Sequence, residues 1–305
     1  MQVGIIIDGQ KMRCYYKEKE LIRVENRVLD HKSVLSMLPD RDPCGHKGDY
    51  GKLLMICGSR GYTGAPALAS IGALRCGAGL VFLSVPDCIY AIEAAKLTEP
   101  VILPLPDNGK TVSASAWKEI SNRMLNADAV LVGCGLGISA DTEAIVTQIL
   151  STYPGTVVLD ADGINVLCNH KDIIRGRTGR TILTPHEGEF IRFGGRLELG
   201  REAAAAEMAR DLGAIVVLKG HRTVTTDGAV CYVNPTGNPG MAVGGSGDVL
   251  AGMITGLLGQ GLPPLEAAAC GVWLHGAAGD CCAEKMGQYG MLPTDMLEVL
   301  PQLLK

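Results

Sequence analysis

The stretch "KLLMICGSRGYTGAPALASIGALRCGAGLVFLSVP", residues 52–86, decides the expected fold. It begins with a continuously apolar run at 52–58 and ends with another at 80–86. Between them, the segment 65–79 is rich in alanine and glycine, which suits a helix that packs closely on its neighbours. An apolar strand, a helix and a second apolar strand are typical of a parallel sheet covered on both faces. We therefore predict a β-α-β unit here.

The same alternation continues on the C-terminal side of this unit. The segment 223–234 predicts a hairpin that turns at Asp227-Gly228. Further strands are expected at 100–105, 129–135, 156–162, 181–185 and 215–220, and helices at 113–125, 141–150, 201–212, 247–260 and 263–285. The fold class that follows is α/β, with a mostly parallel central sheet and helices on both faces.

Composition excludes several classes of protein. The chain has 305 residues, of which 47% are hydrophobic and 20% charged, as in a globular protein. A net charge of −4, no Lys/Arg-rich run and 4% aromatic residues argue against a nucleic-acid partner. The longest apolar run, 249–262, is too short for a membrane span, and the N-terminus lacks a basic signal region. Eleven cysteines without a CxxC pair predict reduced thiols in a cytoplasmic protein.

The first 45 residues differ from the rest. Residues 1–45 are charged and end in a Pro/Asp segment, so we predict an N-terminal arm or linker, with a short strand at 4–7. Residues 46–305 are expected to form one domain.

The stretch "NPGMAVGGSGDVLAG", residues 238–252, is the strongest candidate for chemistry. Gly244, Gly245 and Gly247 leave backbone N–H groups accessible, and a helix starting near Gly247 would direct its positive end at them. Asp248 would then lie in the first helical turn, where it could act as general base for a substrate hydroxyl. A first-turn carboxylate that merely stabilises the helix is the alternative, and the later glycines 252, 256 and 259 indicate packing.

Other polar residues follow predicted strands, where open α/β sheets bind their ligands. His186 and two glutamates follow the strand at 181–185, either as ligand contacts or as an ordinary helix start. Lys219 to Thr223 could hold a nucleotide, although Lys219 could also be a solvated strand end. The glycine-rich loop at 58–64 is either a ligand loop or a surface turn. "GCGLG" at 133–137, with Asp160 after the next strand, could be an imperfect dinucleotide-binding turn.

As an ordered set, these motifs resemble the NAD(P)H-hydrate dehydratase family of ribokinase-like repair enzymes. The resemblance covers His46 to about Leu300, and Val243 and Ser246 stand where threonines are usual. The motifs that carry it are "HKGDYGK", "GSRGYTGAP", "GCGLG", "DADGIN", "TPHEGEF", "LKGHRTVTTDG" and "NPGMAVGGSGDVLAG". The resemblance implies a ribokinase-like three-layer fold.

The resemblance also implies a reaction and a set of residue roles. Hydrated NADH or NADPH (NAD(P)HX) would be phosphorylated on its ring hydroxyl by a nucleotide, ADP rather than ATP, and phosphate would then leave. Mg²⁺ is an expected cofactor, but no motif identifies its ligands. The carried-over substrate contacts are Ala65, Gly135, Gly137, His186 and Asp248, with Asp248 also the catalytic residue, and the nucleotide contacts are Lys219, Gly220, His221, Arg222, Thr223, Gly245, Ser246 and Gly247. A homotetramer and an epimerase domain on a longer or separate chain are further expectations.

Three other functions stay open at this point. A ribokinase-like kinase would phosphorylate an alcohol and release a stable product. A nucleotide sensor would bind without turnover, and an oxidoreductase would use "GCGLG" as a true dinucleotide turn.

Overall fold

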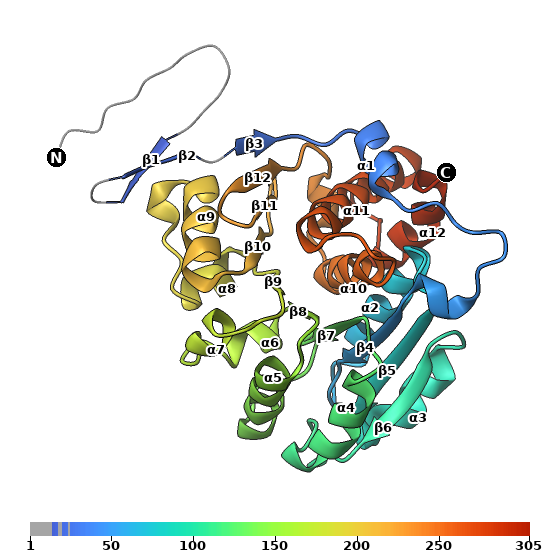
Figure 1. Ribbon diagram of the computed structural model, residues 1–305. Helices are drawn as coiled ribbons and strands as arrows, with labels where there is room; N and C mark the ends of the chain where they lie inside the picture. The colour runs from blue at the N-terminus through green and yellow to red at the C-terminus, as the bar shows by residue number, and fades with distance from the viewer. Residues whose placement is uncertain (1–13, 18–19, 24) are drawn as a thin grey trace.

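The computed structural model describes residues 14–17, 20–23 and 25–305, and its main feature is a ten-stranded sheet (Figure 1). The strand order is β3-β12-β11-β10-β9-β8-β7-β4-β5-β6. The strands are β3 (Glu25–Arg27), β4 (Lys52–Ile56), β5 (Leu80–Pro86), β6 (Val101–Leu105), β7 (Ala129–Val132), β8 (Thr156–Leu159), β9 (Thr181–Leu183), β10 (Ile215–Leu218), β11 (Val224–Thr226) and β12 (Val230–Val233). From β6 to β10 all pairs are parallel, as predicted, whereas β11 and β12 form the predicted antiparallel hairpin.

Helices cover both faces of the sheet, which confirms the α/β class. One core holds the apolar sides of α1 (His31–Met37), α2 (Gly64–Arg75), α3 (Asp87–Lys96), α10 (Ser246–Gly259), α11 (Pro264–Met286) and α12 (Pro293–Leu303). The other holds those of α4 (Trp117–Met124), α5 (Ala140–Thr152), α6 (Asp162–Asn165), α7 (Asp172–Arg175), α8 (Glu187–Arg192) and α9 (Arg201–Leu212). Neighbouring residues of β4 alternate between the two cores: Leu53 and Met55 face the first, Leu54 and Ile56 the second.

The small residues predicted to pack helices together do so between α2 and α10. A Cβ atom on Gly252 would lie 2.0 Å from the Ala69 carbonyl oxygen, and one on Gly256 would lie 2.6 Å from that of Ala73. Only glycine allows the two backbones to approach this closely. This contact fixes the start of α10 relative to the loop before α2.

Residues 25–37 of the N-terminal segment lie against the domain. β1 (Cys14–Lys17) and β2 (Glu20–Arg23) form a two-stranded sheet of their own, and β3 pairs in parallel with β12. In α1, the His31 ring stacks on Trp273 of α11 with ring centroids 5.5 Å apart. The strand expected at 4–7 lies outside the described residues, and the boundary at residue 45 stays a prediction.

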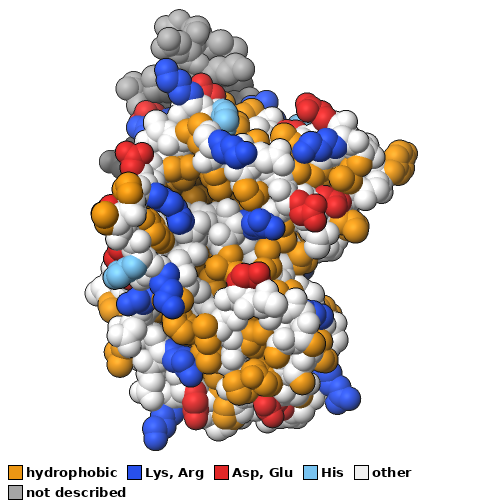
Figure 2. Space-filling view, turned by 90° about the vertical axis from the view of Figure 1, so that its right-hand side faces the viewer, with side chains coloured by type: hydrophobic (Ala, Val, Ile, Leu, Met, Phe, Trp, Pro, Cys, Tyr) orange, Lys and Arg blue, Asp and Glu red, His pale blue; other side chains and the backbone are white. Residues whose placement is uncertain are grey.

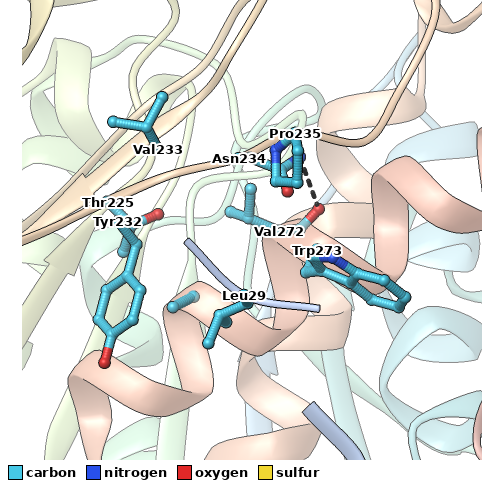
Figure 3. Close-up of a pocket in the computed structure, with 9 residues that line it drawn as sticks. Leu29, Thr225, Tyr232, Val233, Asn234, Pro235, Val272 and Trp273 are labelled. Carbon is cyan, nitrogen blue, oxygen red and sulfur yellow. Dashed lines mark hydrogen bonds between the residues drawn. The ribbon is translucent and has the colours of Figure 1, made fainter. Parts of the chain in front are cut away.

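A small recess lies where this segment meets α11 and β12 (Figure 3). Leu29 lines it together with Tyr232 and Trp273, and its volume is about 10 Å³. That is room for about one water molecule, so the recess is too small for a substrate. The face shown in Figure 2 carries both basic and acidic side chains among scattered apolar ones. Among the described residues, no helix is both long and apolar enough to cross a membrane.

Candidate active site

The start of α10 forms an open cradle of backbone N–H groups. Gly245 is the N-cap residue, with φ 96°, and it offers no side-chain acceptor to the first turn. A Cβ atom on Gly244 would meet nothing within 4 Å, so the loop is open on this side. The helix begins at Ser246, one residue before the expected start. The free N–H groups and the positive helix end therefore suit an anion.

Ser246 is held from behind by a histidine that the sequence analysis missed. The Ser246 hydroxyl lies 3.2 Å from Nε2 of His275, a buried residue of α11. Burial lowers the pKa of His275 to about 4, so its ring is neutral at physiological pH. No periodic signal marks this histidine, because it lies within a continuously buried helix.

Asp248 lies in the first turn of α10, as predicted, and is half-buried. Burial raises its pKa to about 7, and the nearby Asp160 carboxylate adds to this rise. The Cys134 thiol and the Lys219 ammonium partly offset the shift, whereas Asp162 reinforces it. A carboxylate with a pKa near physiological pH is well matched to accept a proton from a hydroxyl.

Lys219 follows β10 and points into this cradle. Its Nζ donates to Asp160 Oδ1 at 2.8 Å and lies 3.2 Å from the position that a Cβ on Gly247 would take. Burial alone would lower the pKa of Lys219, but the carboxylates of Asp160 and Glu189 outweigh it and raise the pKa. Lys219 is therefore a charged ammonium beside the cradle and not a solvated strand end.

The loop after Lys219 is exposed and held in a rare backbone conformation. Arg222 has φ 56°, and the Thr223 hydroxyl donates to the Gly220 carbonyl at 2.9 Å. His221 and Arg222 are exposed. Arg201, which the sequence analysis missed, donates to the carbonyls of Leu218 and Lys219 and so fixes the base of this loop.

His186 is the N-cap residue of α8. Its ring Nδ1 accepts from the backbone N–H groups of Gly188, at 3.0 Å, and of Glu189. The backbone N–H of His186 donates in turn to Glu189 Oε2. The helix-start interpretation is thus confirmed for this stretch. The backbone also forms a parallel bridge with Lys219, which places His186 next to the end of the Lys219 strand.

Two glycine-rich loops meet on the other side of Asp248. Gly58 N–H donates to the Cys134 carbonyl at 2.9 Å, and the Ser59 hydroxyl donates to the Gly135 carbonyl at 2.7 Å. A Cβ on Gly135 would lie 2.9 Å from that of Ala65. The structure therefore brings together Ala65 and the 133–137 loop, although their ligand remains a prediction.

The 133–137 loop does not lead straight into a helix. Gly137 N–H donates to Asp162 Oδ2 at 2.8 Å, and α5 begins only at Ala140, capped by Ser139. A dinucleotide-binding fingerprint places the last glycine at the helix start. The geometry of the 133–137 loop therefore differs from that of the dinucleotide-binding turn that the sequence suggested as an alternative.

One group of side chains in the described part of the chain has the spacing of a metal site. The ligand atoms of Cys134, Asp160 and Asp248 lie within 4.8 Å of one another. Mg²⁺ prefers an octahedron of oxygens, whereas this set contains a thiol, and Asp160 is already paired with Lys219. These residues do not fit a dedicated Mg²⁺ site.

Comparisons with known proteins agree with this geometry. The model of a family described as NAD(P)H-hydrate dehydratase matches residues 53–302. The bifunctional NAD(P)H-hydrate repair enzyme Nnr of Moorella thermoacetica is 44% identical over 286 residues, which are 92% of this chain and 54% of that enzyme. The chain spans about half the length of the curated relatives it matches.

Two solved structures show the same fold. The ADP/ATP-dependent NAD(P)H-hydrate dehydratase of Bacillus subtilis, co-crystallised with ATP and Mg²⁺, is 31% identical, with a TM-score of 0.78 over 90% of this chain and 96% of that one. A ribokinase-like superfamily protein of Enterococcus faecalis V583 is 28% identical, with a TM-score of 0.80 over 92% and 95% of the two chains. With its anion cradle, its half-buried acid and a family match over most of its length, the chain belongs to the NAD(P)H-hydrate dehydratase family.

Proposed function

We propose that this chain restores NADH or NADPH from the hydrated form by a nucleotide-dependent dehydration. The observation that carries the proposal is Asp248, a carboxylate with a pKa of about 7 at the mouth of an uncapped helix start. A base beside an anion cradle suits phosphoryl transfer to a hydroxyl, which is the first half of this reaction.

In the first step, Asp248 takes the proton of the ring hydroxyl as its oxygen attacks the terminal phosphorus of the nucleotide. The new P–O bond forms as the bond to the leaving nucleotide breaks, so that ADP leaves as AMP. The backbone N–H groups of Gly245 and Gly247 and the Lys219 ammonium stabilise the negative charge that spreads over the phosphoryl oxygens. In the second step, the phosphate departs with the C–O bonding electrons, the neighbouring ring carbon loses a proton, and the ring double bond returns.

The two substrates are assigned to opposite sides of Asp248. Lys219 to Thr223 and the cradle face the nucleotide, whereas Ala65, Gly135, Gly137 and His186 contact NAD(P)HX. Support comes from the geometry: the 220–223 loop is exposed, and the Ala65 and Gly135 loops pack on each other next to Cys134. We propose ADP as the donor, in line with the ADP/ATP-dependent relative from Bacillus subtilis.

Mg²⁺ is proposed to enter with the nucleotide phosphates, because the described side chains do not fit a site of their own. The curated relatives are bifunctional and about twice as long. An epimerase domain on a longer or separate chain is accordingly proposed as a partner. A homotetramer is also proposed, from the resemblance alone.

The test is to incubate hydrated NADH or NADPH with the protein, Mg²⁺ and either ADP or ATP. The dihydronicotinamide absorbance band should return only with nucleotide, together with one AMP (or ADP) and one phosphate per ring. A stable phosphorylated product would instead identify a kinase, hydride transfer an oxidoreductase, and binding without turnover a sensor.

A further inference from the structure

The thiol of Cys134 lies beside two carboxylates, the proposed base Asp248 and its neighbour Asp160. Cys134 lies two residues after the end of β7, and its side chain is fully buried. Its Sγ donates to Asp160 Oδ2 at 3.5 Å, and Sγ and one oxygen of each of Asp160 and Asp248 lie within 4.8 Å of one another. No role has so far been given to this side chain.

The other oxygen of Asp160 is already occupied. Oδ1 accepts from Lys219 Nζ at 2.8 Å and from the Thr184 hydroxyl at 2.6 Å. Among the described residues, Cys134 is the one whose side chain donates to Oδ2, the oxygen left over from the Lys219 pair. The thiol thus sits beside the Asp160 oxygen that does not pair with Lys219.

We infer that Cys134 is a positioning residue for Asp248: its thiol lies beside both the Asp160 and the Asp248 carboxylate, and its single S–H donates to this pair through Asp160 Oδ2. The inference rests on the proposed function, in which Asp248 is the base.

The thiol is held as a neutral donor at this position. The neighbouring Cys57 thiol, burial, and the charges of Asp160 and Asp248 raise the pKa of Cys134 well above its ordinary value. It therefore adds no third negative charge. A thiol is also a weak donor, which matters because a strong donor would make Asp248 a poorer base.

The groups that face Asp248 come from three strand ends. Asp160 and Asp162 follow β8 and raise its pKa, Lys219 follows β10 and lowers it, and Cys134 follows β7 and lowers it modestly. The charged neighbours of Asp248 therefore shift its pKa in opposite directions. The resulting pKa depends on which side chain occupies position 134.

Two substitutions shift this balance in opposite directions. In Cys134→Ala the donor is lost and the carboxylates face each other, so the pKa of Asp248 should rise. In Cys134→Ser a stronger hydroxyl donor replaces the thiol, so the pKa should fall. Each shift is expected to be about half a unit to one unit.

The experiment measures the acidic limb of kcat/KM against pH in the full chain with hydrated NADH and ADP. The limb should move to higher pH in Cys134→Ala and to lower pH in Cys134→Ser. Cys231→Ser is the matched control, because Cys231 is an equally buried thiol in β12. Its limb should not move. Limbs that stay in place, or that move in the same direction in both Cys134 variants, overturn the inference.

A second readout does not require turnover. The carboxyl carbon of Asp248 is followed by NMR in protein labelled with ¹³C-aspartate, with Asp248→Asn identifying the signal. Opposite shifts of its midpoint in the two Cys134 variants support the inference even if the wild type fails to dehydrate the hydrate, which would refute only the proposed function. An unchanged midpoint in a wild type that does turn over refutes the inference alone.

Discussion

Of the helices that carry an aspartate in the first turn, α5 and α10 begin in opposite ways. At α5, Ser139 caps the helix, and Asp141 accepts from the Ala114 N–H and the Asn108 amide, both at 3.1 Å. At α10, Gly245 supplies no side-chain cap, and Asp248 faces a second carboxylate and a thiol. One start is closed by the protein's own groups, whereas the other is left open for a ligand.

The difference shows that an aspartate in the first turn is not by itself evidence of function. Asp141 does what helix-end electrostatics predict and ties α5 to the loop before α4. Asp248 also lies in the first turn, as the third helical residue where Asp141 is the second, but burial and Asp160 work against its charge. Poor stabilisation of the charged form is what makes a carboxylate useful as a base near neutral pH.

The largest expected effect separates the two aspartates by catalysis. Asp248→Asn should lower kcat by roughly 10²- to 10⁴-fold, because the amide cannot accept the hydroxyl proton. Asp141→Asn should leave kcat unchanged and serves as the matched control. Turnover of hydrated NADH with ADP, followed by absorbance, measures both. A near-normal kcat in Asp248→Asn would remove Asp248 from the role of base.

The second effect is the pH dependence that follows from Asp248. Its pKa is about 7, and the base must be unprotonated, so activity should rise with pH and level off above this value. Below it, kcat/KM should fall by about tenfold per pH unit. The pH profile of the wild type measures this with substrate and nucleotide held far below saturation. A kcat/KM profile that is flat from about pH 5 to about pH 8 would contradict the assignment of Asp248 as the base.

The parallel strands and the open start of α10 could be predicted from the sequence, because their signals are local. Apolar runs marked the parallel strands, and the glycines before Asp248 marked the open helix start. The Lys219–Asp160 pair could not be predicted, since it depends on β8 and β10 lying on either side of β9. Cys134 was visible inside "GCGLG", but nothing in the spacing indicates that its thiol faces two carboxylates.

The N-terminal segment shows the same limit at the level of the fold. Its charged composition suggested an arm, and the parallel pairing of β3 with β12 joins residues about 200 positions apart in a chain of 305. Such pairing depends on the partner strand's edge being free. Composition carries no information about that edge, so the docking of this segment appears only in the structure.

A smaller effect concerns stability: replacing the aspartate by asparagine should stabilise the protein at position 248 and destabilise it at position 141. The pKa of Asp248 lies above the ordinary value of 3.8, so the native state binds this proton more tightly than the unfolded chain. Its contribution to stability therefore falls as pH rises from about 4 to 7 and stays low above that. Asp248→Asn should be more stable than wild type by about 1 kcal/mol at pH 8, with the gain fading towards pH 4.

Thermal unfolding at the two pH values measures this difference. Asp141→Asn should instead be slightly less stable than wild type at pH 8, because it loses a favourable charge at a helix start. If Asp248→Asn is also destabilised at pH 8, the carboxylate is not held against its preference, and the contrast between the two helix starts fails.

The smallest effect tests the cap itself. The Ser139 hydroxyl accepts from the Thr142 N–H at 3.1 Å, so Ser139→Ala should cost about 1 kcal/mol of stability. Its kcat should not change, because a closed start takes no part in the reaction.

At Gly245 the backbone has φ 96°, and a Cβ would lie 2.5 Å from Leu68 Cδ1. Gly245→Ala should therefore strain the open start and weaken nucleotide binding as well as stability. Calorimetric titration with ADP beside thermal unfolding separates the two variants: equal losses of ADP affinity would mean that the open cap does not bind the nucleotide.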